Sequence, residues 1–455
     1  MNYTYDSNPV NSSFSQYTTG RLAVAQYTLC GGGNSTPVTE MYSYHPAGAV
    51  TSKQMDLYRC GNDSNGNYVC GNGFVEADYT YNSAGQVATY SSYTEHGGLP
   101  WNTWAGPTVY TYAYDGMGRA ASLTDNSGQL NGTGQNTQWV QNGTYDFAGR
   151  MTSLQMLGQT KTQTWNVNGQ MTSVSQSASG IQYNYSATAN NGRITGVVDS
   201  ISGETISYQY DALKRLTSAS STPSVGSTPS AWTENFQYDG FGNLTAKVLN
   251  GTTATIGVNA ATNRLASATY DLNGNMISGA GASLVYDEAN RLASATPMSG
   301  GTEYYGYAPD NKRVYRVKPG SPSYPPATEY VTLYGAYGER LGVYSIWGMA
   351  DNYNAAPYLA MQSVSTSVWF AGQLISENGT TKMDRLGTNR AGELGFIRMG
   401  MRLLRRGMTG LSLRLIQGIR LRVWIMQISE CMRRRTAGSI SLIRDTPALL
   451  EIQVR

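Results

Sequence analysis

The residues best suited to chemistry in this chain are aspartates that directly follow a tyrosine. Carboxylates in such numbers could serve as general acids and bases if two of them met in a cleft. Each aspartate, however, holds the same place in a recurring phrase: an aromatic residue, Asp or Asn, two variable residues, Gly or Asn, a polar residue, then Leu, Met or Val. A fixed place in a repeat is explained by structure alone, so we interpret these aspartates as turn formers.

The phrase occurs in six full copies and in looser copies that begin at Tyr81 and Trp165. Asp and Asn open turns, and Gly and Asn tolerate the positive φ that closes a hairpin. The predicted structural turn residues are Tyr114, Asp115 and Gly118; Tyr145, Asp146 and Gly149; Tyr210 and Asp211; Tyr238, Asp239 and Gly242; Tyr270, Asp271 and Gly274; and Tyr286 and Asp287.

The residues that flank each phrase alternate between apolar and polar, which predicts a half-buried strand on either side of the turn. One hairpin is marginal in water, so neighbouring hairpins must cover one another. The fold class we predict is mainly β: stacked antiparallel hairpins that form a curved or spiral sheet, a partial shell. The 34 Tyr against 7 Phe suit a sheet with a wet face, because the tyrosine hydroxyl needs a partner.

Other kinds of site find little support. His45 and His96, the two histidines, both precede Gly- or Pro-rich turns, and they cannot build a histidine metal cluster. The segment from Asp63 to Asn67 resembles part of a calcium loop but lacks the glutamate at its twelfth position, which leaves calcium as a minor alternative. We therefore expect no catalytic residue, no cofactor and no metal ligand.

Cys60 and Cys70 bracket a polar, turn-rich loop. In an exported protein a disulfide could close a hairpin there, and two unpaired thiols are the alternative. The sequence leaves the two possibilities open.

The repeated phrase resembles the YD repeats of Rhs proteins, of teneurins and of the cocoon-forming subunits of insecticidal toxin complexes. The resemblance covers about residues 1–394 and includes a second landmark, Trp369 to Ile375 followed by Asp384 to Arg390. It implies a large hollow β-shell, which in bacterial members encloses a toxic C-terminal segment. The closing D-P-x-G phrase, associated with self-cleavage in that family, is missing here, so the resemblance carries over no catalytic residue.

Residues 395–455 have a different composition. They hold 12 Arg and 3 acidic residues, with no Tyr, Asn or Lys, so their net charge is +9 and residues 1–394 carry −6. We predict two regions: a YD-repeat β-shell over 1–394 and an Arg-rich tail over 395–455, helical or disordered. A shifted reading frame is our preferred interpretation of this tail; a basic amphipathic segment and a toxin cargo are the alternatives.

The resemblance and the repeat together predict a structural shell protein that encapsulates or presents a polypeptide and is not an enzyme. We expect a fragment of a longer secreted or cell-surface parent, without a signal peptide of its own, a membrane span or a nucleic-acid partner. Open sheet edges would allow self-association. The alternatives are a cell-surface module that binds protein or carbohydrate, with Trp101 and Trp104 stacking on sugars, and a shell that carries a toxin in 395–455.

Overall fold

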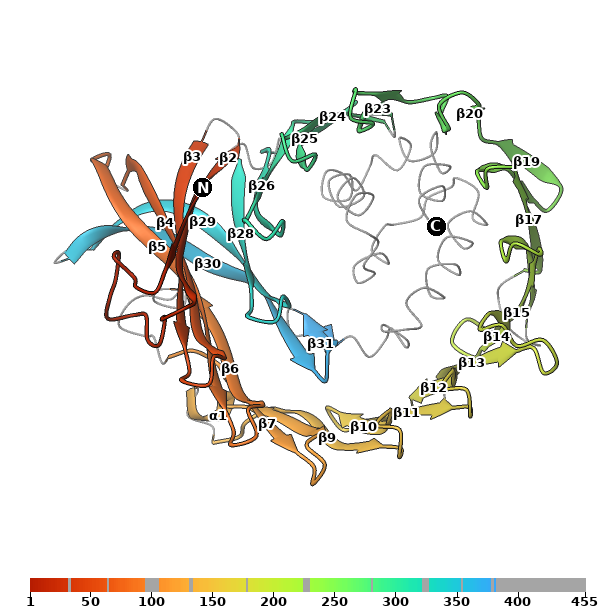
Figure 1. The fold of residues 1–455 in the computed structure, drawn as a ribbon, viewed down its shortest axis with the longest axis horizontal. Coiled ribbons are helices and arrows are strands. Elements are labelled where there is room, and N and C mark those ends of the chain that lie inside the picture. Colours follow the sequence, from red (N-terminus) through yellow and green to blue (C-terminus); the bar gives the residue numbers. More distant parts are fainter. Residues whose placement is uncertain are drawn as a thin grey trace. The chain divides into compact units, whose positions relative to one another are not determined.

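The computed structural model describes residues 1–31, 34–63, 65–94, 106–130, 134–176, 179–223, 230–279, 281–320, 327–352, 355–377 and 380–381. Nearly all secondary structure in these ranges is antiparallel β-strand, which confirms the predicted fold class (Figure 1). The helical exception is one turn, α1 (Ser127–Leu130). No pairing recorded there closes a sheet on itself. None of the helical structure described is long and apolar enough to cross a membrane.

The chain divides into two compact units. Among the described residues, unit 1 comprises those within 1–143 and 301–381, and unit 2 comprises those within 144–300. The Arg-rich tail predicted for 395–455 lies outside the described residues. In both units the strands follow one another in chain order as a meander, as expected for consecutive hairpins.

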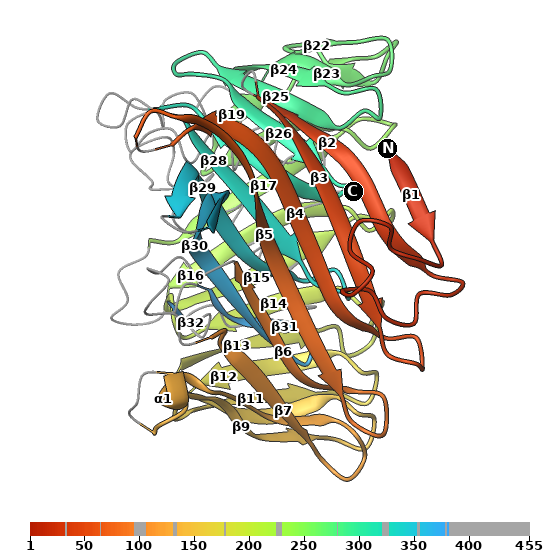
Figure 2. The same ribbon diagram turned by 90° about the vertical axis from the view of Figure 1, so that its left-hand side faces the viewer.

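The first sheet of unit 1 joins each strand to the next along the chain, and Figure 2 shows β2 to β6 running side by side. Its strands are β1 (Asn2–Tyr5), β2 (Leu22–Gly31), β3 (Asn34–Tyr44), β4 (Val50–Asn62), β5 (Tyr68–Tyr81), β6 (Val87–Thr94), β7 (Val109–Tyr114), β8 (Ala120–Asp125) and β9 (Gln138–Tyr145), the last ending just beyond the unit boundary.

The second sheet of unit 1 packs against the first, with β30 against β5 and β26 against β2. Its strands are β26 (Glu303–Tyr307), β27 (Arg313–Lys318), β28 (Thr328–Tyr334), β29 (Arg340–Asn352), β30 (Ala355–Phe370), β31 (Gln373–Glu377) and β32 (Thr380–Thr381). The core of unit 1 includes Leu29, Met55, Leu57, Val75, Tyr315, Leu333 and Phe370, all at most 1% exposed.

Unit 2 is a meander of shorter strands. They are β10 (Met151–Met156), β11 (Gln159–Trp165), β12 (Met171–Gln176), β13 (Ser179–Tyr185), β14 (Ile194–Asp199), β15 (Glu204–Tyr210), β16 (Leu216–Pro223), β17 (Trp232–Tyr238), β18 (Leu244–Leu249), β19 (Thr252–Thr255), β20 (Val258–Asn259), β21 (Arg264–Leu265), β22 (Thr269–Tyr270), β23 (Met276–Gly279), β24 (Ala282–Tyr286) and β25 (Leu292–Pro297). Burial alternates along β15, as a strand with one covered face requires.

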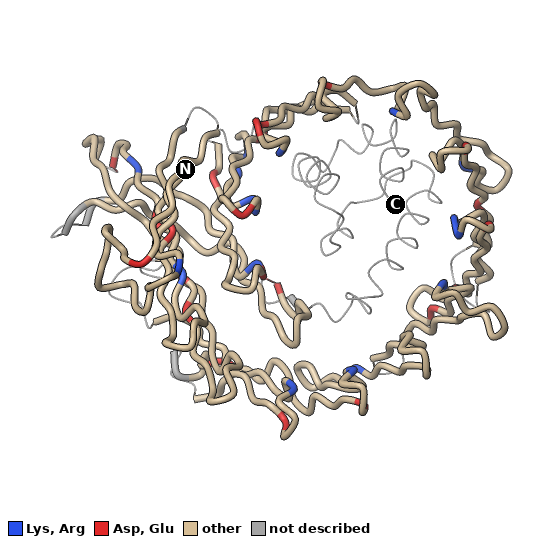
Figure 3. Tube along the Cα trace, in the orientation of Figure 1, with Lys and Arg blue, Asp and Glu red and all other residues tan. Residues whose placement is uncertain are grey.

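A hydrophobic cluster on neighbouring strands gives unit 2 its main core: Val174, Tyr183, Ile194, Val197, Ile206, Tyr208, Ala219 and Trp232. Charged side chains are sparse along the traced chain (Figure 3). Stability must therefore come from the sheet ladder, from this lateral packing and from the polar contacts of the turns.

Candidate functional site

The copy that begins at Tyr114 shows what the repeated phrase builds. Asp115 donates its backbone N–H to the carbonyl of Arg119 at 2.8 Å, and Gly118 donates to the carbonyl of Asp115 at 2.9 Å. The carboxylate oxygen Oδ1 of Asp115 accepts the backbone N–H groups of Met117 and Arg119, both at 2.9 Å. Gly118 has a φ of +75°, which a residue with a side chain rarely adopts. One carboxylate thus organises a whole five-residue turn.

The same two backbone hydrogen bonds recur in every predicted copy, between the second and sixth positions and between the fifth and second. The residue at the second position donates its N–H in the first bond and accepts with its carbonyl in the second. The residues at this position are Asn82, Asp115, Asp146, Asn166, Asp211, Asp239, Asp271 and Asp287. Lys214 and Asn290 occupy the position that glycine holds elsewhere, with φ of +67° and +59°. The pattern therefore tolerates other residues there, at some cost in backbone strain.

Strand register is also shared. The aromatic residue pairs with the residue six positions later, as Tyr210 does with Leu216 and Tyr238 with Leu244, and a bulge precedes the aromatic residue in both hairpins. A bulge increases local twist and re-aims the side chain that follows it. In both hairpins the aromatic ring is turned toward the preceding hairpin.

That ring makes the contact that joins one repeat to the next. The hydroxyl of Tyr238 donates to the carbonyl of Leu216 at 2.8 Å, and the hydroxyl of Tyr210 donates to the carbonyl of Ile194 at 2.9 Å. Equivalent contacts within one unit join Tyr44 to Leu22, Tyr81 to Val50, Tyr114 to Val87, Trp165 to Met151 and Tyr185 to Met171. Trp165 replaces tyrosine because its indole N–H is also a donor. The need for a donor explains why Tyr so outnumbers Phe.

Arginine at the sixth position contributes to the same junction. Arg215 forms an ion pair with Asp211 in its own turn at 2.6 Å and lies over the ring of Tyr238 in the next repeat, 4.8 Å from the ring centre. Arg150 likewise pairs with Asp146 and lies over Trp165. A guanidinium group can bind a carboxylate through its edge and stack on a ring through its face. These two turns are therefore tied to the next repeat by a charged group as well as by hydrogen bonds.

These contacts also set the acidity of the turn aspartates. Hydrogen bonding by the backbone N–H of Arg119 holds the pKa of Asp115 below its usual value, and the Arg150 side chain does the same for Asp146. The pKa values of Asp211, Asp239 and Asp271 are lowered by equivalent bonds. A carboxylate with a lowered pKa is a weak base near neutral pH and a poor proton donor.

Several further turns share this geometry but were missed in the sequence. His45, Asp63, Ala308 and Gly335 stand at the second position and make both backbone bonds. His45 imitates the aspartate, with Nδ1 accepting the backbone N–H of Ala47 at 3.2 Å. At His45, Ala308 and Gly335 the preceding tyrosine and the later glycine or asparagine were the usable signal, because the second position is more variable than the six full copies suggest.

Asp63 forms the same kind of turn, and this accounts for the segment considered as a calcium loop. Its Oδ1 accepts the backbone N–H groups of Asn65 and Asn67, and its Oδ2 accepts the side-chain amide of Asn67. The carboxylate oxygens are engaged by donors. Within the described ranges no group of three His, Cys, Asp or Glu could hold a metal ion. His96, Trp101 and Trp104 lie outside the described residues.

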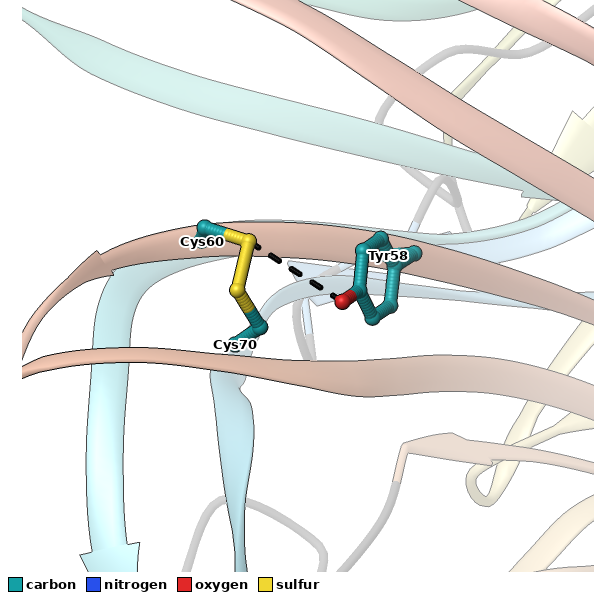
Figure 4. Close-up of a disulfide and its surroundings, with 3 residues drawn as sticks. All are labelled: Tyr58, Cys60 and Cys70. Carbon is teal, nitrogen blue, oxygen red and sulfur yellow. Dashed lines mark hydrogen bonds between the residues drawn. A yellow bond between two sulfur atoms is a disulfide. The ribbon is translucent and has the colours of Figure 1, made fainter.

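Cys60 and Cys70 form a disulfide across the β4–β5 hairpin, which decides between the two possibilities that the sequence left open (Figure 4). The two residues face each other directly in the ladder. The hydroxyl of Tyr58 lies 4.0 Å from the sulfur of Cys60. The bond therefore closes the outer end of the hairpin.

At two glycines of β5 the first sheet of unit 1 lies directly against the backbone of the second. A Cβ atom on Gly71 would lie 2.1 Å from the carbonyl oxygen of Pro357, and one on Gly73 would lie 2.3 Å from that of Leu359. Near the same interface Arg59 forms an ion pair with Glu329 at 2.7 Å. The absence of a side chain at these glycines is thus a condition for the packing of β5 against β30.

Comparison with known proteins agrees with this geometry. A family model described as RHS Repeat matches residues 190–228, which include the copy at Tyr210. No curated protein sequence matches the chain. The crystal structure of TcdB2-TccC3 is similar to 82% of this chain, with a TM-score of 0.57 and 14% sequence identity. That of TcdB2-TccC3-TEV is similar to 79%, with a TM-score of 0.53 and 16% identity.

This chain spans only about a fifth of those structures, 21% and 20% of their respective chains. The likeness therefore concerns the fold of a part. The repeated phrase, its shared turn and register, the matched repeat over residues 190–228 and the common fold agree with one another, and together they support the resemblance to Rhs/YD-repeat proteins.

Proposed function

We propose that this chain is a segment of an Rhs-type shell that encloses or presents a polypeptide and catalyses no reaction of its own. The observation that supports this most is the mutual engagement of the repeat's polar groups. Aspartate binds the backbone of its own turn and often the arginine there, and tyrosine binds the preceding hairpin. These groups serve the construction of a sheet, and the lowered pKa values of aspartates such as Asp115 and Asp146 are poorly matched to acid–base chemistry.

The proposed boundaries assign residues 1–394 to the shell and 395–455 to a segment of different origin. The Arg-rich composition of 395–455 supports this assignment. Translating the other two reading frames of the gene around codons 390–396 tests it. A Tyr- and Asp-rich continuation in another frame is the expected result, and its absence from both frames would count against a frame shift.

The proposed location is outside the cell or at its surface, as part of a longer parent. The disulfide between Cys60 and Cys70 supports an oxidising compartment, because cytosolic thiols are kept reduced. This chain is similar to a fifth of the TcdB2-TccC3 chain. Together with the family resemblance, which implies a shell around a polypeptide, this similarity supports a polypeptide as the partner.

Protection from proteolysis tests the function. A short unstructured reporter segment with one protease site would be fused to the C-terminus of the full chain and its cleavage rate compared with that of the free reporter. The control carries valine at Gly118, Gly149 and Gly242, where φ is positive and valine strains the turn. Enclosure is supported if the reporter is cleaved more slowly in the unaltered chain than as the free reporter, and if the valine variant does not slow its cleavage. Equal rates for all three samples would contradict it.

A further inference from the structure

The second sheet of unit 1 has one face against the first sheet and one face turned away from it. On the packed face, Tyr315 pairs with Gly306 and Val331, and Gly306 lies against Leu29 of the first sheet. Side chains alternate along a strand, so the neighbouring row belongs to the other face. That row, here called the Arg316 row, crosses five strands through directly paired residues: Tyr305, Arg316, Tyr330, Ser345 and Gln362.

Arg316 is the unusual member of the row. Its side chain is only 6% exposed, and its guanidinium lies over the ring of Tyr330, 4.7 Å from the ring centre. Two of its nitrogens, Nε and Nη2, are buried without any hydrogen-bond partner. A buried amine or carboxyl can lose its charge, but a guanidinium keeps it. An unpaired buried charge is strongly unfavourable, so this position suits a group that receives an anion.

The surroundings are cationic and aromatic. Arg313, at the start of the same strand, lies over the ring of Tyr305 at 5.1 Å. The acidic residue of the neighbouring strand, Glu303, accepts the hydroxyl of Tyr305 at 3.1 Å. A guanidinium group that lies over a ring, as that of Arg316 does, can still bind a carboxylate in a bidentate manner through its N–H edge.

We propose that Arg316 binds a carboxylate of an extended acidic segment in the enclosed or presented polypeptide, a step that rests on the proposed function. Five paired strands at ~4.8 Å spacing give the row a length of roughly 19 Å, which matches about six extended residues. The Arg-rich residues 395–455 have the wrong charge for this role. The occupant is therefore an acidic stretch of another polypeptide.

Fluorescence anisotropy with a labelled deca-glutamate peptide tests the site on the full chain at low salt. Replacing Arg316 by Met should weaken binding by about ten- to a hundredfold, the value of a hydrogen-bonded charge pair. Arg193→Met is the matched control, since it removes the same charge from a guanidinium stacked on Tyr210 in unit 2. The control should bind the peptide as the unaltered chain does.

Thermal unfolding of the same variants separates binding from structure. Arg316→Met removes a buried charge without a partner, so its Tm should stay the same or rise. A lower Tm, no binding by the unaltered chain, or equal losses in both variants would each overturn the inference. Reporter protection is measured independently: protection without peptide binding would refute the Arg316 site alone, and peptide binding without protection would refute the proposed function.

Discussion

Two tyrosines on one strand allow the junction between repeats to be tested with the same chemical change. Tyr210 and Tyr208 lie two residues apart on β15. The hydroxyl of Tyr210 donates to the carbonyl of Ile194 at 2.9 Å. The hydroxyl of Tyr208 is buried, with the side chain 5% exposed, and has no hydrogen-bond partner. Replacing each by Phe removes one oxygen and leaves the ring in place.

Only the first of the two substitutions, Tyr210→Phe, should lower the free energy of unfolding. Tyr210→Phe removes a made hydrogen bond and should cost about 0.5–1.5 kcal/mol. Tyr208→Phe removes a hydroxyl that was desolvated without compensation, so it should be neutral or stabilising by up to about 1 kcal/mol. The difference between the variants, about 0.5–2.5 kcal/mol, is the quantity to compare.

Urea unfolding followed by tryptophan fluorescence measures this difference in the free energy of unfolding, because Trp232 belongs to the same hydrophobic cluster as Tyr208. The slope against urea must stay unchanged for the midpoints to be compared. Equal costs for the two variants, or a larger cost for Tyr208→Phe, would refute the role given to the repeat's aromatic hydroxyl.

Three further predictions concern packing and turns. Gly73→Ala should destabilise unit 1 by about 1–3 kcal/mol, because its Cβ would meet the carbonyl of Leu359; Gly116→Ala, with open space around it, should change the melting temperature little. Gly242→Val should cost about 1–3 kcal/mol at a φ of +87°, whereas Gly240→Val in the same turn should cost less, which denaturant midpoints would show. Asp115 and Asp239 have lowered pKa values, so their contribution to stability is present above the unfolded pKa of about 4 and is lost as pH falls through the folded values. Acid titration of the melting temperature should show this loss, and a constant Tm down to about pH 2 would contradict it.

The sequence predicted the architecture because the repeat is local. The chemistry of Asp115 and Gly118 dictates a turn within five residues, and period-two alternation fixes the strands beside it. The unrecognised copies, such as those at His45 and Gly335, lie outside the recognised series and extend it at both ends. Substitution at the defining position concealed them.

Contacts between distant segments could not be predicted in the same way. Nothing in the sequence pairs Gly73 with Leu359 or Arg59 with Glu329, since these depend on how two sheets of unit 1 pack. The partner of the tyrosine hydroxyl could not be predicted either, because it is a backbone carbonyl and every type of residue has one. The excess of Tyr over Phe indicated a need for partners without identifying them.

Residue-level amide hydrogen exchange tests the central claim most directly, that one hydrogen-bonded turn recurs at every copy of the phrase. In the copy at Asp115 the amides of Asp115, Met117, Gly118 and Arg119 are all donors. The amide of Gly116 has no such bond recorded. We predict four protected amides and one that exchanges fast, repeated with the same spacing in the other copies. Fast exchange throughout the phrases, or a different pattern in each, would contradict the account.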